Sequence, residues 1–144
     1  MGRLLCMHGM KKIGIFLGAT PGSGGMFQYS LAILEALSAL SRDDFDVIVA
    51  SINPAWWSYV EPLKLPHMSL GNPDGLERYT LGWIWHKLCL PVAPWKKFFW
   101  QLDPVALALQ KTECDLWIFP AQDHWGYLAP VPTLVAIHDL MHRY

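Results

Sequence analysis

Reactive side chains crowd the last seven residues of the sequence, where His138, Asp139 and His142 follow the apolar run 132–137. That run is short, rich in β-branched residues and apolar on both alternating faces, which is typical of a strand buried inside a parallel sheet. His138 and Asp139 would then lie at the carboxyl end of a strand, where ligands bind in open α/β sheets. An imidazole there can donate or accept a hydrogen bond near neutral pH, and Asp139 can orient it or bind a hydroxyl group.

His138 and His142 stand four positions apart, as the histidines of one class of zinc site do. That class needs both histidines on one face of a helix, whereas the apolar run predicts that His138 ends a strand. We therefore expect a hydroxylated or phosphorylated ligand and no metal. A purely structural role, with His138 capping a loop, is the alternative.

The glycine-rich segment 18–25 is a second candidate site, because it connects an expected strand at 12–17 to an expected helix at 26–40. Backbone N–H groups in such a turn and the positive end of the helix attract an anion, usually phosphate. A Walker loop would need Lys followed by Ser or Thr, but Met26 follows the glycine pair. The dinucleotide fingerprint would need glycine where Phe27 stands. The loop is therefore expected to bind a phosphate group, and ATP hydrolysis and NAD binding are disfavoured. A turn without a ligand is the alternative.

A third polar loop, 122–127, follows an expected strand at 115–119 and contains Asp123 and His124 beside two aromatic residues. Aromatic rings can cover the apolar faces of sugars while polar groups bind the hydroxyls. The three loops would converge at the carboxyl edge of one sheet. A solvated connection between elements is the alternative for this loop.

Strands expected at 12–17, 45–50, 115–119 and 132–137 must position these loops, with an irregular strand near 65–70. The helix at 26–40 follows from apolar residues at three- and four-residue spacing. The opening strand, helix and strand predict a right-handed crossover and a parallel sheet. Asp103 and Pro104 read as the N-cap and first turn of a helix over 105–111. The expected fold class is α/β, a Rossmann-like parallel sheet flanked by helices.

The composition suits one core-forming domain, since 53% of the 144 residues are hydrophobic and 16% are charged. A net charge of -1 disfavours nucleic acid as a partner, because phosphate backbones attract a clear Lys and Arg excess. Three cysteines without a CxxC pair fit a reducing cytoplasm. No run approaches the roughly 18 to 20 apolar residues of a membrane span. We expect residues 1–11 to be an irregular leader, with Met10 as an alternative start.

The segment from Trp83 to Trp100 holds four tryptophans and three lysines, and Pro91 and Pro94 divide it into two expected short helices. Such residues can form a core helix and its lid. They can also lie in a membrane interface, where indole rings reach headgroup depth and lysines meet anionic lipid. The first interpretation is favoured because compositional signals of this kind are weak, and peripheral membrane contact is the alternative.

Three stretches together resemble the amino-terminal domain of family 4 (group 1) glycosyltransferases of the GT-B fold. They are residues 12–25 with the pair Gly24 and Gly25, the helical residues 27–32, and residues 135–144. The resemblance implies two Rossmann-like domains with a cleft between them. The first domain binds mostly the acceptor, and the second binds mostly a nucleotide-sugar donor.

The resemblance also implies roles for individual residues. Gly24 and Gly25 match the loop that approaches the donor diphosphate, and His138 matches a histidine near the transferred sugar. Asp139 lies next to His138 in the sequence and is expected at the same site. The other expected contacts, to the acceptor or the sugar, are Asp123, His124 and His142. Such enzymes retain anomeric configuration, need no metal or other cofactor, and stabilise the departing diphosphate electrostatically.

The donor-binding domain, with its paired glutamates, has no counterpart in the 144 residues, so 12–144 would be a partial amino-terminal domain. We expect no transfer from this chain alone. The expected parent enzyme moves a sugar to a hydroxyl of a glycan or lipid-linked acceptor, in the cytoplasm or at the inner face of the cell membrane. A stand-alone α/β module that binds phosphate or sugar without catalysis is the alternative, and a peripheral membrane adaptor built on 83–100 is a third.

Overall fold

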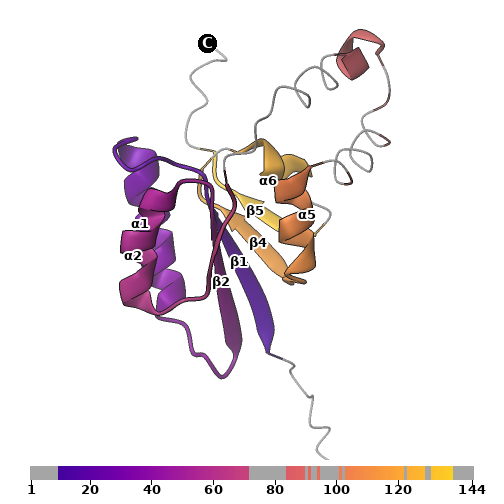
Figure 1. Ribbon diagram of the computed structural model, residues 1–144. Coiled ribbons are helices and arrows are strands. Elements are labelled where there is room, and N and C mark those ends of the chain that lie inside the picture. The colour runs from indigo at the N-terminus through magenta and orange to yellow at the C-terminus, as the bar shows by residue number, and fades with distance from the viewer. Residues whose placement is uncertain are drawn as a thin grey trace, which may run out of the picture.

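Five parallel strands form one sheet in the order β3-β2-β1-β4-β5 (Figure 1). This computed structural model describes residues 10–71, 84–89, 91, 94, 101, 103–121, 123–128 and 131–137, with the backbone alone at 124 and 128. The predicted α/β class and parallel sheet are confirmed, and the irregular strand near 65–70 is β3. The strands are β1 (Lys11–Leu17), β2 (Phe45–Ser51), β3 (His67–Ser69), β4 (Leu116–Phe119) and β5 (Thr133–Val135).

The central strand β1 is buried on both faces, because helices cover both sides of the sheet. Ile15, Phe16 and Leu17 are all fully buried although they point alternately to opposite faces. β1 pairs with β2 over seven residues, from Lys11 opposite Phe45 to Leu17 opposite Ser51. β1 begins one residue inside the leader that the sequence predicts.

Helices lie on both faces of the sheet (Figure 1). On one face, α1 (Gly25–Ser38) buries Phe27, Leu34 and Leu37. It begins one residue before the start of the predicted helix at 26–40, and it ends two residues before the end of that helix. The short turns η1 (Pro54–Trp56), α2 (Trp57–Val60) and η2 (Glu61–Leu63) lie on the same face. On the other face lie α5 (Pro104–Lys111) and α6 (His124–Leu128).

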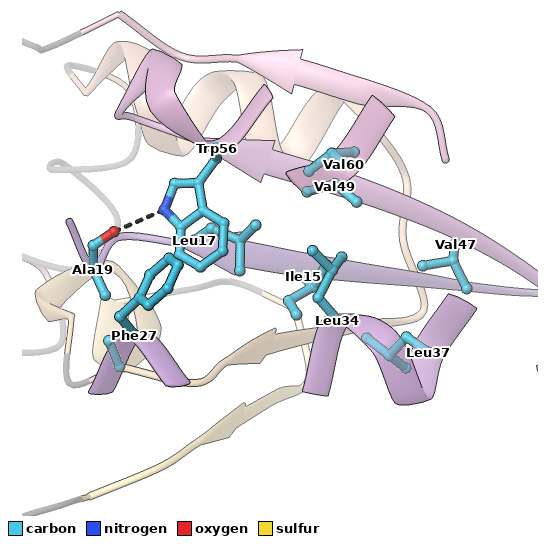
Figure 2. Packing of buried hydrophobic residues seen from close by; sticks show 11 residues of the cluster. Ile15, Leu17, Ala19, Phe27, Leu34, Leu37, Val47, Val49, Trp56 and Val60 are labelled. Carbon is cyan, nitrogen blue, oxygen red and sulfur yellow. Dashed lines mark hydrogen bonds between the residues drawn. The ribbon is translucent and has the colours of Figure 1, made fainter. Parts of the chain in front are cut away.

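Each face of the sheet therefore has its own core. We call these the α1-side core, shown in Figure 2, and the α5-side core. Burying one such side chain contributes about 1.5 to 3 kcal/mol. The α1-side core contains Ile15, Leu17, Ala19, Phe27, Leu34, Leu37, Val47, Val49, Trp56, Val60 and Ala121. The α5-side core contains Phe16, Ala50, Leu70, Val105, Leu109, Cys114, Trp117, Phe119 and Trp125.

One glycine inside β1 is required by packing. The fully buried indole of Trp117 lies across Gly14, so that a Cβ on Gly14 would come within 2.5 Å of ring atom Cδ2. Gly14 and Trp117 are also register partners of β1 and β4. The close approach of these two strands therefore depends on a residue without a side chain.

The predicted cap of the helix at 105–111 is confirmed. Asp103 is the N-cap of α5, and its Oδ1 accepts from the N–H groups of Val105 at 2.8 Å and Ala106 at 3.0 Å. Its Oδ2 accepts from Nε1 of Trp125 at 3.1 Å. One fully buried carboxylate thus joins the start of α5 to α6.

Most of the tryptophan-rich segment lies outside the described residues. Within the described part, residues 84–87 form a helical turn, and Nε1 of Trp85 donates to the Pro91 carbonyl at 3.1 Å. The choice between a core lid and a membrane contact stays a prediction. Among the helices of the described residues, none has the length and apolarity to span a bilayer.

Candidate functional site

The direction of the sheet reverses between β1 and β4. From β1 the chain adds β2 and β3 on one side, and it then returns to place β4 on the other side of β1. The connection after β1 leaves toward the α1-side core and the connection after β4 toward the α5-side core. In open α/β sheets, loops that diverge in this way bound the place where ligands bind, at the carboxyl ends of the strands. We call the corresponding place here the β1–β4 crevice, and the described residues on its two sides are 18–25 and 120, 121 and 123.

The glycine loop has backbone conformations that need glycine. Gly22 has φ 95°, and Gly24, the N-cap of α1, has φ 64° and ψ −130°, a region closed to side-chain-bearing residues without strain. Gly22 lies within a tight turn, in which Thr20 O accepts from Ser23 N at 3.0 Å and from Ser23 Oγ at 2.6 Å. Within the described part of the chain no side chain caps α1, so its first N–H groups face water or a ligand.

Trp56 fixes this loop to the body of the protein. Its Nε1 donates to the Ala19 carbonyl at 2.7 Å, and its side chain is 0% exposed (Figure 2). Its ring lies 4.9 Å from that of Phe27 in the first turn of α1. One indole therefore holds both the start of the loop and the start of the helix. This role of Trp56 has no signal in the sequence, because nothing local distinguishes it among eight tryptophans.

Asp123 packs its carboxylate against Gly18, the first residue of the glycine loop. A Cβ on Gly18 would overlap Oδ2 of Asp123 and would lie 2.8 Å from its Cγ. Oδ2 is buried and has no hydrogen-bond partner among the described residues. Burial raises the pKa of Asp123 from 3.8 to about 6. A partly buried acid with one unpartnered oxygen, in the loop that follows β4, is a candidate ligand contact.

This acid makes stability depend on pH in a defined direction. Because the folded-state pKa is raised, the stabilising contribution is complete below about pH 4 and is lost as the pH rises through about 6. Asp123→Asn should remove this dependence. Between pH 4 and pH 8 the free energy of unfolding of the parent should therefore fall by about 2 kcal/mol more than that of the variant. Urea unfolding at both pH values measures the difference. Asp43→Asn, which removes an exposed carboxylate, should give no such gain.

The remaining predicted site residues are described only in part or not at all. His124 is the first residue of α6, and its side chain lies outside the described residues, as do His138, Asp139 and His142. Their convergence with the glycine loop stays a prediction. Among the described residues, no group of three or more His, Cys, Asp or Glu could hold a metal ion. The choice against a metal at His138 and His142 stays a prediction too.

The strand before His138 differs from the prediction of a buried interior strand. β5 is an edge strand paired only with β4 in the described sheet, and Leu134 is 59% exposed. A strand of β-branched, apolar residues can be buried on both faces of a sheet. Whether helices cover both faces depends on the rest of the fold, which the composition of the strand does not show. Its carboxyl end still reaches the predicted edge, since Ala136 N donates to Phe119 O at 2.9 Å.

An apolar groove of about 350 Å³ runs between α1 and the uncovered α1 side of β4 and β5. Tyr29 and Ile33 line it from α1, and Pro120, Leu134 and Ala136 line it from the strands and their ends. No helix of the described residues covers this part of the sheet. The sequence offers no signal for the groove, because it depends on which face each crossover takes.

A hydroxyl–imidazole pair at the other side of the sheet has a structural role. Ser51 Oγ lies 2.8 Å from Nε2 of His67, which links the end of β2 to β3. Ser51 is fully buried, so it cannot reach a substrate as a nucleophile would. Burial also lowers the pKa of His67, which keeps its ring neutral near pH 7.

Comparison of the chain with protein-family models, curated proteins and solved structures finds no match in any of the three.

Proposed function

We propose that this chain is the acceptor-side Rossmann-like domain of a GT-B glycosyltransferase, which moves a sugar from a nucleotide-sugar donor to a hydroxyl acceptor. The proposal is carried by the reversal of strand order between β1 and β4, together with the residues on either side of it. On one side lies an uncapped helix start with glycine conformations suited to an anion. On the other side lies the carboxylate of Asp123, whose Oδ2 has no hydrogen-bond partner among the described residues and which could accept from a hydroxyl group. A nucleotide sugar supplies both kinds of group.

In this proposal the first N–H groups of α1, at Gly24 and Gly25, bind the diphosphate and stabilise its charge as it departs. Asp123 accepts a hydrogen bond from a sugar or acceptor hydroxyl. His138 and Asp139 follow β5, whose end lies beside that of β4, and they would complete the site next to the transferred sugar. Transfer would retain the anomeric configuration and use no metal, as the family resemblance implies.

Binding and transfer are separable in such an enzyme. The contacts that stabilise the transition state come from both sides of a cleft between two domains, and losing one side removes the geometry that transfer needs. We therefore expect the 144 residues alone to bind a nucleotide sugar weakly and to transfer nothing.

Gly25→Ala separates ligand binding from folding. No described atom lies within 4 Å of a Cβ on Gly25, and its φ is not positive, so alanine fits and should stabilise the start of α1 slightly. If a diphosphate lies directly against this backbone, the added methyl blocks it. We expect at least a roughly tenfold loss of affinity for uridine- and guanosine-diphosphate sugars by calorimetry, with an unchanged or higher melting temperature.

Gly71→Ala is the matched control. Gly71 has equal open space and follows β3, two strands away from β1. Its alanine variant should bind as the parent does. Equal affinity of Gly25→Ala and the parent would contradict the proposed diphosphate position. Tight binding by the chain alone would instead favour the stand-alone module, because the donor contacts of a two-domain enzyme lie mostly in its other half.

A further inference from the structure

The apolar groove beside α1 opens at the carboxyl edge of the sheet. Pro120 and Ala136, which directly follow β4 and β5, line it at that edge. From there it extends along α1, with Tyr29 near the start of the helix and Leu40 just beyond its end. At a rise of 1.5 Å per residue, these two positions are about 16 Å apart along the helix axis. One end of the groove therefore lies at the edge of the sheet where the proposed transfer site lies.

The walls of the groove offer hydrocarbon and almost no polar group. On the sheet side, Ile118 and Leu134 are register partners of β4 and β5, so their side chains share the α1 face. On the helix side, Tyr29, Ile33 and Ala36 line it at four- and three-residue spacing. Among the described residues of the lining none is charged, and the one polar side chain is the phenol of Tyr29, from the half of α1 nearer the carboxyl edge. A charged or strongly polar ligand would lose its hydration here without gaining partners.

The size of the groove separates a small ligand from a protein partner. Sites for small molecules have volumes of about 300 to 1,000 Å³ and mostly apolar linings, and this groove has about 350 Å³. A specific protein interface buries about 800 Å² on each partner. Within the described lining, the large hydrophobic side chains that are strongly exposed are Leu134 at 59% and Tyr29 at 43%, whereas Leu37 and Phe119 are buried. The groove is therefore a narrow slot and not a broad apolar face.

We propose that the apolar groove binds one hydrocarbon chain of an amphiphilic acceptor, whose polar head then lies at the carboxyl edge of the sheet. The role as acceptor rests on the proposed function, whereas chain binding rests on the groove itself. The position of Tyr29 toward the carboxyl edge supports this orientation, because the polar end of the lining then faces the polar end of the ligand. Each methylene taken from water into the groove should raise affinity about threefold.

Alkyl glucosides are suitable probes, because their uncharged sugar head stays the same while the chain length changes. Affinities of the full chain for hexyl, octyl and decyl β-glucoside are measured by calorimetry below the micelle concentration of each. We expect a gain of about tenfold for each pair of methylenes. Equal affinity for the three glucosides would overturn the proposal, because the sugar head alone would then account for binding.

Ala36→Phe places an aromatic ring in the groove, and Ala32→Phe is the matched control. Both alanines are exposed on α1, so the two changes have the same cost in helix propensity, but Ala32 does not line the groove. Ala36→Phe should bind decyl glucoside at least about tenfold more weakly than the parent, and Ala32→Phe should bind it as the parent does. Equal affinity of the two variants would overturn the groove as the site and leave the proposed function intact, since Gly25→Ala tests that function separately.

Nuclear Overhauser contacts in the parent give an independent result if Ala36→Phe folds poorly. The methylenes of decyl glucoside should contact the methyl groups of Ile33 and Leu134, which line the groove. Leu88 is 63% exposed and lies outside it. Contacts with Leu88 in place of the groove residues would show binding to any exposed apolar side chain and would overturn the proposal.

Two other occupants of the groove give different results. Sedimentation should show a monomeric parent, and a dimer that Ala36→Phe dissociates would assign the groove to a second copy of the chain. Replacing both Leu140 and Met141 by serine should leave the affinity for decyl glucoside unchanged. A gain in affinity would show that the end of this chain competes for the groove, and it would overturn the proposal as the dimer would. Chain binding by a protein that binds no nucleotide sugar would overturn the acceptor role alone.

Discussion

Replacing Trp56 by alanine should lower the free energy of unfolding by about 5 kcal/mol. Large aromatic side chains deleted from a core cost about 3 to 5 kcal/mol, and a carbonyl left without its donor adds about 1 kcal/mol or more. Trp56 meets both conditions, since it is fully buried and donates to Ala19 O. Because small domains have only about 5 to 15 kcal/mol of stability, we expect Trp56→Ala to have a large unfolded fraction in urea-free buffer, which far-ultraviolet circular dichroism measures.

Trp56→Phe tests the hydrogen bond with most of the packing kept. An aromatic ring still faces Phe27, but no N–H reaches the Ala19 carbonyl. We expect a loss of about 1 to 3 kcal/mol in urea unfolding and weaker nucleotide-sugar binding, because the glycine loop loses its attachment. Trp57→Phe is the control, since Trp57 is 52% exposed and should change stability by about 0.5 kcal/mol or less. Equal effects of the two changes would contradict the role of Trp56.

Replacing Asp103 by alanine should cost about 3 to 4 kcal/mol. The cap of α5 contributes about 1 to 2 kcal/mol, and the bond from Trp125 to a charged acceptor contributes about 1.5 to 3 kcal/mol. Both are made by one buried carboxylate, so alanine leaves the indole N–H of Trp125 without that acceptor. Urea unfolding followed by tryptophan fluorescence measures the loss, and Trp125 itself reports the change in its surroundings.

Asn53→Ala is the matched control for Asp103→Ala, because Asn53 also caps a helix. Asn53 Oδ1 accepts from Ala55 N at 2.9 Å at the start of η1, but this bond is exposed to solvent. Its loss should cost about 1 kcal/mol or less, because water can replace the acceptor. Asp103→Asn keeps a cap oxygen and should fall between the two alanine variants. A cost for Asp103→Ala no greater than that for Asn53→Ala would show that the link to α6 contributes nothing.

The elements with local signals were predictable from the sequence. The cap at Asp103 and Pro104 and the βαβ start with its glycine loop depend on residues a few positions apart, and they are found where expected. The edge position of β5 in the described sheet was not predictable, because it depends on which strands add to the sheet and which faces the crossovers cover. An apolar strand can have the same sequence at the edge of a sheet as in its interior.

The candidate site divides in the same way. The polar loop that contains Asp123 was predicted to contact a ligand, since it follows a strand at the carboxyl edge. Its contact with Gly18 and its unpaired oxygen could not be foreseen, because those residues meet only when β1 and β4 pair. The same holds for Trp56 on the loop and for Trp117 across Gly14. Each depends on a partner that is remote in the sequence.

The pairing of β1 with β4 also bears on how the protein reaches its fold. β1 and β2 are joined by one helix, whereas Lys12 and Asp115, bonded at the foot of β1 and β4, stand 103 positions apart. Closing so long a loop is slow and entropically costly, so the β1–α1–β2 unit should form first and β4 should join later. The crevice lies where β4 joins β1, a contact that forms late in folding. Its two walls are brought together in a late step of folding, and a local opening between them would dismantle the site while leaving the β1–α1–β2 unit folded.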